Sequence, residues 1–241
     1  MKSITKQIVF FLSVTLMLSS CNMNMLNSVN GNKNVEVADR TVAEDFTKIK
    51  VSTGLDLYLS QGTENKVTLE ADENLHEIIF TEVENGELKI YSEKNIWNAK
   101  AKKVYVTVKD LTSLVATSGS DVYTEEELSV ENINIICTSG ADINVELKAN
   151  SVISTATSGS DIELNGSTIN HTSSATSGAS IDAYGLRSEN VTVNVTSGAD
   201  INIYASVSLD ARATSGGDID FKGNPKNVKK SSTSGGSISA N

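Results

Sequence analysis

A six-residue phrase recurs along the C-terminal half of this chain: Thr-Ser-Gly, a small residue, Asp or Ser, and then Val or Ile. Its glycines are spaced 21, 19, 19, 20, 18 and 19 residues apart. A period this short and regular predicts a solenoid, in which each repeat is one coil that buries its apolar side by stacking on its neighbours. The turn glycines are Gly119, Gly140, Gly159, Gly178, Gly198, Gly216 and Gly235.

Apolar and polar residues alternate on both sides of each glycine, as in Ile143-Asn144-Val145. A period of two is typical of half-buried strands. We therefore expect an all-β, right-handed parallel β-helix with two short strands per coil of about 19 residues. The Thr-Ser-Gly bend joins the strands on one side, and polar turns such as Asn165-Gly166-Ser167 join them on the other. Glycine accepts the backbone angles of so tight a reversal.

The region before the first repeat contains a degenerate copy of the phrase, Ser52-Thr53-Gly54. We expect one domain over 46–241, with irregular N-terminal coils over 46–112 and regular repeats over 113–241. Trp97, in an irregular excursion, is predicted to plug the N-terminal end of the core, the alternative being a contact residue. Lysines near the C-terminal coil are predicted either to prevent edge pairing or to flank a self-association surface. They are Lys226, Lys229 and Lys230.

The N-terminus has the features of an export signal. Lys2 and Lys6 precede an apolar stretch over 8–18 that is too short to span a bilayer well. The following Leu18-Ser19-Ser20-Cys21 resembles the lipobox of bacterial lipoproteins. We expect a lipoprotein signal peptide over 1–20, a lipid on Cys21, and a polar, flexible tether over 21–45. An ordinary secretory signal is the alternative.

The formal charge of −10, or −12 once Lys2 and Lys6 are removed, argues against a nucleic-acid partner and against binding to anionic lipid headgroups. Contact with a membrane is therefore expected through the lipid on Cys21. The other cysteine, Cys137, has no partner for an intramolecular disulfide once Cys21 is acylated.

An acidic column occupies the second position after five of the seven glycines, and Ser180 and Ser237 take that position after the other two. We expect these carboxylates to accept hydrogen bonds from turn amides, with weak cation binding as the alternative and catalysis as the remotest option. The column contains Asp121, Asp142, Asp161, Asp200 and Asp218.

The sequence contains few other candidates for metal-binding or catalytic residues. His76 and His171 have no second ligand at zinc spacing, and we expect His171 to be buried or to cap a turn. The threonines of the phrase are expected to form a hydroxyl ladder between coils rather than an ice-binding array. We expect no catalytic residue and no cofactor, a pectin-lyase-like enzyme acting on polysaccharide being the alternative.

The lipobox, the segment Phe46 to Gly54 and the serial phrase together resemble the GIN-domain family over 47–241. That family is described as adhesin heads of autotransporters and is common in Bacteroidota lipoproteins. The resemblance implies a right-handed β-helix without a recognised catalytic set. It favours a non-enzymatic lipoprotein of the cell envelope, in the outer membrane, that serves adhesion or scaffolding by binding a protein or glycan through flat polar faces. The residues after Cys21 lack the acidic run associated with surface export, so the side of the membrane stays open.

Overall fold

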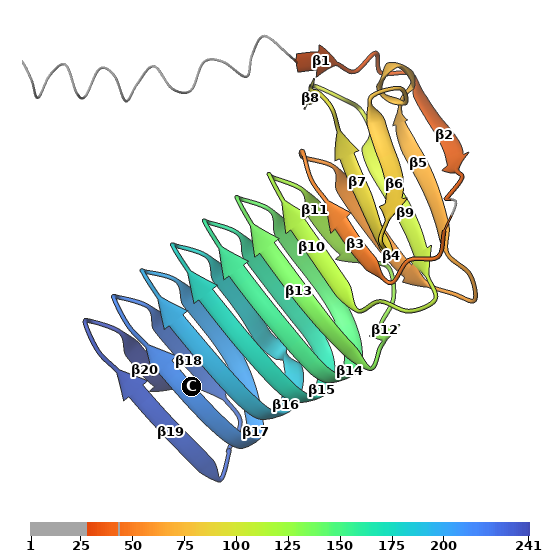
Figure 1. Ribbon diagram of the computed structural model, residues 1–241. Coiled ribbons are helices and arrows are strands. Elements are labelled where there is room, and N and C mark those ends of the chain that lie inside the picture. Colours follow the sequence, from red (N-terminus) through yellow and green to blue (C-terminus); the bar gives the residue numbers. More distant parts are fainter. Residues whose placement is uncertain (1–27, 43) are drawn as a thin grey trace, which may run out of the picture.

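The computed structural model describes residues 28–42 and 44–241, which form a β-solenoid with a smaller group of strands at its N-terminal end (Figure 1). The expected signal peptide and Cys21 lie outside the described residues. None of the helical segments in the described ranges has the length and apolarity needed to span a bilayer.

The solenoid consists of parallel coils stacked in register. In its centre, the strand after one bend continues without a break into the strand before the next, so that a coil is a single bent strand. Paired isoleucines in adjacent coils, such as Ile143 with Ile162, show the parallel register. The strands are β10 (Ser113–Thr117), β11 (Asp121–Thr124), β12 (Leu128–Ser129), β13 (Asn132–Thr138), β14 (Asp142–Thr157), β15 (Asp161–Thr176), β16 (Ser180–Thr196), β17 (Asp200–Ala213), β18 (Asp218–Lys222), β19 (Asn227–Ser232) and β20 (Ser237–Ala240).

The bends have two consecutive residues with positive φ. At the fifth bend, φ is 58° for Ser197 and 64° for Gly198. A tight reversal with both central residues in the left-handed region suits glycine, whereas serine is strained there. The amide of Gly198 donates to the carbonyl of Ser215 in the next coil at 3.2 Å. This hydrogen bond joins one bend to the next, in a turn where the serine adopts positive φ.

The inward columns form one continuous core. The residue three positions after each turn glycine is buried in six of the seven repeats, from Val122 to Ile219, and Ile238 packs partly buried against that core. Small residues occupy the corner: a β-carbon added to Gly236 would lie 2.6 Å from the backbone of Ala213. His171 is buried, as expected, and its Nε2 lies 2.9 Å from Oγ of Ser154.

The N-terminal part combines coil-like parallel stacking with antiparallel strands. Strands β3 (Lys48–Val51) and β4 (Asp56–Gln61) flank the degenerate bend and stack in parallel on β10 and β11. Strands β7 and β9 stack in parallel on β3 and β4, as a further irregular coil would. Antiparallel pairing, which the sequence did not predict, is added to this stack: β5 pairs with β9, and β6 with β7. These strands are β5 (Lys66–Asp72), β6 (Ile79–Glu84), β7 (Glu87–Ser92) and β9 (Lys102–Val108), and a 3-10 turn η2 (Glu73–Leu75) follows β5.

The expected tether is wrong from residue 28 onward. Strand β1 (Ser28–Asn30) pairs with β8 (Asn95–Trp97), and β2 (Val35–Arg40) pairs antiparallel with β5. The buried carboxylate of Asp72 links the segment between β1 and β2 to the residues just before β9. Its Oδ2 accepts the amide of Lys33 at 2.9 Å, and its Oδ1 accepts the amide of Ala101 at 3.0 Å. Polar composition concealed these contacts, since they are made by backbone amides rather than apolar side chains.

The prediction that Trp97 plugs the core is also wrong. The side chain lies on β8 and is 67% exposed. Buried residues of the antiparallel strands, among them Leu69 on β5 and Ile79 on β6, belong to the same hydrophobic core as the solenoid. The antiparallel strands therefore contribute the apolar side chains at this end, and an aromatic plug is unnecessary.

Candidate binding face

The acidic column forms a straight row along one outer face, which we call the aspartate row. The backbone of each member pairs in register with the next, from Asp56 on β4 to Ser237 on β20. The row contains Asp56, Asp121, Asp142, Asp161, Ser180, Asp200, Asp218 and Ser237.

Backbone hydrogen bonds hold the row in place. The amide of Asp142 donates to the carbonyl of Ser120 at 3.0 Å, and the amide of Asp161 donates to that of Ala141 at 3.1 Å. We expected the carboxylates to accept from turn amides, but the turn amides are used between coils. Within the described part of the chain, Asp56 is the one carboxylate of the row with a side-chain hydrogen bond, and its donor is Lys102. The other carboxylates therefore remain available to solvent or to a ligand.

Stacking the carboxylates has an electrostatic consequence. Partial burial, with added repulsion from Asp56 and Asp142, raises the pKa of Asp121 above its ordinary value, and Lys102 opposes that shift. Partial burial and repulsion from Asp142 likewise raise the pKa of Asp161. Burial and the charges of Asp218 and Asp220 do the same for the pKa of Asp200. A positive charge beside the row would therefore stabilise it.

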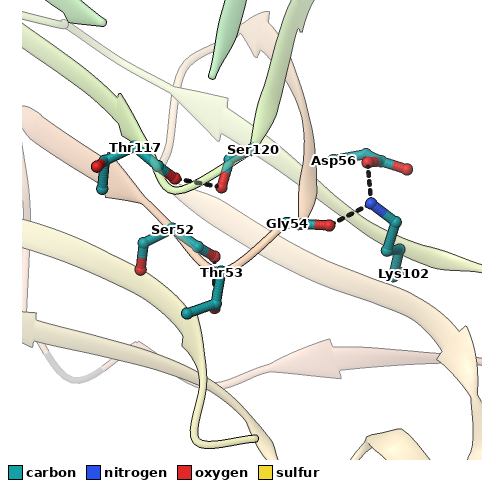
Figure 2. Close-up of polar contacts among 7 residues, drawn as sticks. All are labelled: Ser52, Thr53, Gly54, Asp56, Lys102, Thr117 and Ser120. Carbon is teal, nitrogen blue, oxygen red and sulfur yellow. Dashed lines mark hydrogen bonds and ion pairs between the residues drawn. The ribbon is translucent and has the colours of Figure 1, made fainter. Parts of the chain in front are cut away.

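One positive charge is already present at the N-terminal end of the row. Figure 2 shows Nζ of Lys102 between the carbonyl oxygen of Gly54 and the carboxylate of Asp56, with Nζ 2.9 Å from Oδ1 of Asp56. The strand β9, which carries Lys102, lies beside β4 in parallel register. Lys102 thus places an ammonium group of the protein itself beside Asp56, the first carboxylate of the aspartate row.

The row has no arrangement typical of a metal centre. In residues 28–42 and 44–241, three or more His, Cys, Asp or Glu side chains converge nowhere on a point where a metal ion could be held. The backbone register places one member of the row on each coil, so neighbouring carboxylates lie about 4.8 Å apart and face outward rather than toward a centre. Weak cation binding by Asp121, Asp142, Asp161, Asp200 and Asp218 stays a prediction.

Three tyrosines form a stack beside the row, and the sequence reasoning missed them. The ring centroids of Tyr58 and Tyr105 are 5.1 Å apart, and those of Tyr58 and Tyr123 are 5.5 Å apart. The hydroxyl of Tyr105 donates to Glu70 at 3.0 Å, and burial, followed by this bond, raises the pKa of Tyr105 to about 12. Alignment of the degenerate bend with the first regular one would have paired Tyr58 with Tyr123, since both are four residues after the glycine.

The threonines of the phrase form hydroxyl contacts between coils, as expected. Oγ1 of Thr138 lies 3.0 Å from that of Thr157, and Oγ1 of Thr214 donates to that of Thr196 at 3.0 Å. Each of the first five threonines of the phrase also lies 3.4 Å from the hydroxyl of the serine that follows it. The threonine column is therefore explained by contacts within the protein.

The buried Ser154–His171 pair lacks the setting of a nucleophile. Ser154 is fully buried and His171 is 1% exposed, so Oγ of the serine faces the core. Burial lowers the pKa of His171 to about 4, which keeps the ring neutral at physiological pH. Its Nδ1 has no hydrogen-bond partner, whereas a catalytic histidine is oriented by a second group. This pair belongs to the interior of the coil.

The comparisons with known proteins agree with the fold. The family model described as "Putative auto-transporter adhesin, head GIN domain" matches residues 45–225. A solved putative adhesin from Bacteroides fragilis is 23% identical, covers 88% of this chain and 100% of its own, and superposes with a TM-score of 0.80. None of the curated proteins matches the chain.

Two solved structures from Parabacteroides distasonis are also similar. One, described as a putative lipid binding protein, is 21% identical with a TM-score of 0.74 and covers 89% of this chain and 99% of its own. The other, a putative adhesin, is 20% identical with a TM-score of 0.72 and covers 89% and 100%. At sequence identities this low, the structural similarity shows the fold alone.

Proposed function

Because the chain belongs to the family of auto-transporter adhesin head GIN domains, we propose that it is a non-enzymatic, lipid-anchored adhesion protein of the cell envelope. The observation that carries the proposal is the aspartate row, which continues in register from β4 to β18 on an outer face. A repeated surface suits multivalent contact with a partner, because most coils offer a carboxylate at the same position, with Ser180 interrupting the row on β16.

Enzymatic action is less well supported by this geometry. Catalytic sites bring unlike groups together at one point, whereas this face repeats one group along a line. A depolymerisation assay on a panel of neutral and acidic polysaccharides tests the pectin-lyase-like alternative. Clear turnover by the purified protein would revive it.

Anchoring is proposed through a lipid on Cys21, in the outer membrane. Cells that express the full chain are grown with a radiolabelled fatty acid, and the label is expected on the wild type and absent from Cys21→Ala. Protease treatment of intact cells then reports the side of the membrane. Digestion of the protein supports adhesion, whereas protection would replace adhesion by scaffolding inside the envelope.

Binding itself is tested with whole cells. Wild-type cells and cells that carry Asp121→Asn, Asp142→Asn and Asp161→Asn together are compared for adhesion to protein-coated and glycan-coated surfaces. Equal surface amounts of the two proteins are the control. Loss of adhesion in the triple variant supports the aspartate row as the binding face, and unchanged adhesion would assign binding elsewhere.

A further inference from the structure

Tyr123 is at the C-terminal end of the tyrosine stack. Its ring stacks on Tyr58 on one side, while its backbone partner on the other side is Asn144, which offers no aromatic ring. The residue is 39% exposed. Tyr123 therefore has a ring face that no aromatic group of the described chain covers.

Two carboxylates flank this ring. Asp121 lies two residues before Tyr123 on β11, so both side chains point to the same face, and Asp142 is the partner of Asp121 on β14. Both carboxylates are close enough to affect the hydroxyl of Tyr123 electrostatically. In the described part of the chain, none of the ion pairs and none of the cation–ring contacts involves these three residues.

The neighbouring strands show what such a combination accommodates. Nζ of Lys103 lies 5.9 Å from the ring centroid of Tyr58 and 3.8 Å from Oε1 of Glu70. Nζ of Lys102 lies on Asp56. Lys103 of β9 thus lies near the ring of Tyr58 and the carboxylate of Glu70 on β5. A second lysine of β9, Lys102, pairs with Asp56 of β4. On β11 and β14 the ring and the carboxylates recur, and the one nearby lysine, Lys102, affects Asp121 electrostatically while its ammonium group is paired with Asp56.

We propose that Tyr123, Asp121 and Asp142 bind an arginine or lysine side chain of a partner protein, so that the adhesion target presents a basic segment. The inference rests on the proposed function and specifies its ligand. Charge complementarity selects this occupant, because the protein has a net charge of −10 and this site concentrates negative charge beside an exposed ring. Arginine fits better than lysine, since its planar group can stack on Tyr123 while it donates to a carboxylate.

A glycan fits this surface less well. Stacking of a sugar requires open ring faces, but Tyr58 has Tyr105 on one side and Tyr123 on the other. The tyrosine stack therefore offers one open face rather than a broad platform. Acidic glycans would in addition be repelled by the aspartate row.

The test measures binding of the full chain, purified in detergent, to a labelled 12-residue peptide of alternating arginine and threonine. Fluorescence anisotropy gives the Kd at 150 mM salt. The Asp121→Asn/Asp142→Asn variant is expected to weaken binding roughly tenfold. The matched control is Glu64→Gln/Glu189→Gln, which removes the same number of charges at exposed positions outside the site and is expected to change Kd less than about twofold.

A second variant separates the ring from the charge. Tyr123→Leu leaves the net charge unchanged and is expected to weaken the arginine peptide more than the equivalent lysine peptide. Cooperative unfolding at a melting temperature close to or above that of the wild type establishes that the variants fold. Equal losses in the carboxylate and control variants would overturn the proposal, since general charge attraction would then account for binding.

Failure of the wild type to bind the peptide would also overturn the proposal, as would preferential binding to a neutral oligosaccharide offered at the same concentration. Neither result depends on where the protein lies in the cell. Protection from external protease would contradict the adhesion role and leave this measurement valid, so the two failures can be told apart.

Discussion

Nζ of Lys102 lies 2.9 Å from Oδ1 of Asp56, where the antiparallel strands meet the first coil of the solenoid. The contact connects β9 to β4 and also reduces the charge of the aspartate row at its N-terminal end. Its partners are separated by 46 residues in sequence, so it ties the two parts of the molecule together.

Removal of this ammonium group should weaken the junction. We expect Lys102→Met to lower the free energy of unfolding by about 0.5–1 kcal/mol, because the pair is only partly shielded from water. Urea denaturation measures the change. The control is Lys66→Met, whose ion pair with Asp39 is more exposed and should contribute less. Equal effects of the two substitutions would contradict a special role for Lys102.

Stability should depend on the charge of the aspartate row. The folded-state pKa of Asp161 is raised, so its ionised form destabilises the native state at pH 7, and this penalty is lost as the pH falls through that pKa. We expect Asp161→Asn to raise the melting temperature by roughly 1–2 °C at pH 7. The gain should vanish below pH 3.8, the ordinary value for the group. A gain that persists at pH 3 would show that neither partial burial of the charged carboxylate nor its repulsion by Asp142 is the cause.

Asp72 should show the opposite dependence on pH. Burial alone would raise its pKa, but the backbone amides of Lys33, Ala101 and Lys100 together hold it below the ordinary value. Its stabilisation is complete above pH 3.8 and is lost as the pH falls through the folded-state pKa. We expect Asp72→Ala to cost about 2–3 kcal/mol in urea denaturation at pH 7, because buried amides lose their acceptor.

The exposed Asp39 provides the control for that measurement. Asp39→Ala removes a solvent-exposed carboxylate from the neighbouring strand β2 and should change stability far less than Asp72→Ala does. If Asp72→Ala were equally mild, the carboxylate would not be what fixes residues 28–40 to the sheet.

Substitutions at the bends should affect stability through the backbone conformation they require rather than through steric clashes. A β-carbon added to Gly198 would have no atom within 4 Å, yet φ is 64° there. We expect Gly198→Ala to cost about 1–2 kcal/mol, and Ser197→Asn to stabilise slightly, because asparagine tolerates positive φ. Thermal unfolding of both variants measures the effects. A neutral Gly198→Ala would contradict the conformational explanation.

The regular part of the fold could be predicted from the sequence because period and alternation act locally. Each coil repeats the same inward positions, so the pairing of Ile143 with Ile162 follows from a spacing of 19 residues. All seven turn glycines have positive φ, the backbone region that the tight reversal was expected to require. The left-handed serines were not foreseen, because serine has no intrinsic preference for that region.

The N-terminal part could not be predicted in the same way. Pairing of β2 with β5, or of β5 with β9, depends on long-range contacts that no repeat period specifies. The position of Tyr105 depends on another such pairing, because Tyr105 lies beside Tyr58 only when β9 pairs with β4. The place of Tyr105 in the candidate site therefore became visible only in three dimensions, whereas the pairing of Tyr58 with Tyr123 follows from the repeat.

The central strands all begin at the second residue after a turn glycine, and β14, β15 and β16 end at the threonine of the next phrase. A coil is thus an exchangeable module whose two ends meet its neighbours at equivalent points. Duplication or loss of one such module during evolution would lengthen or shorten the molecule while the outer rows kept their alignment. The length of the molecule and the number of its outward-facing positions could then change while the residues on each coil stayed the same.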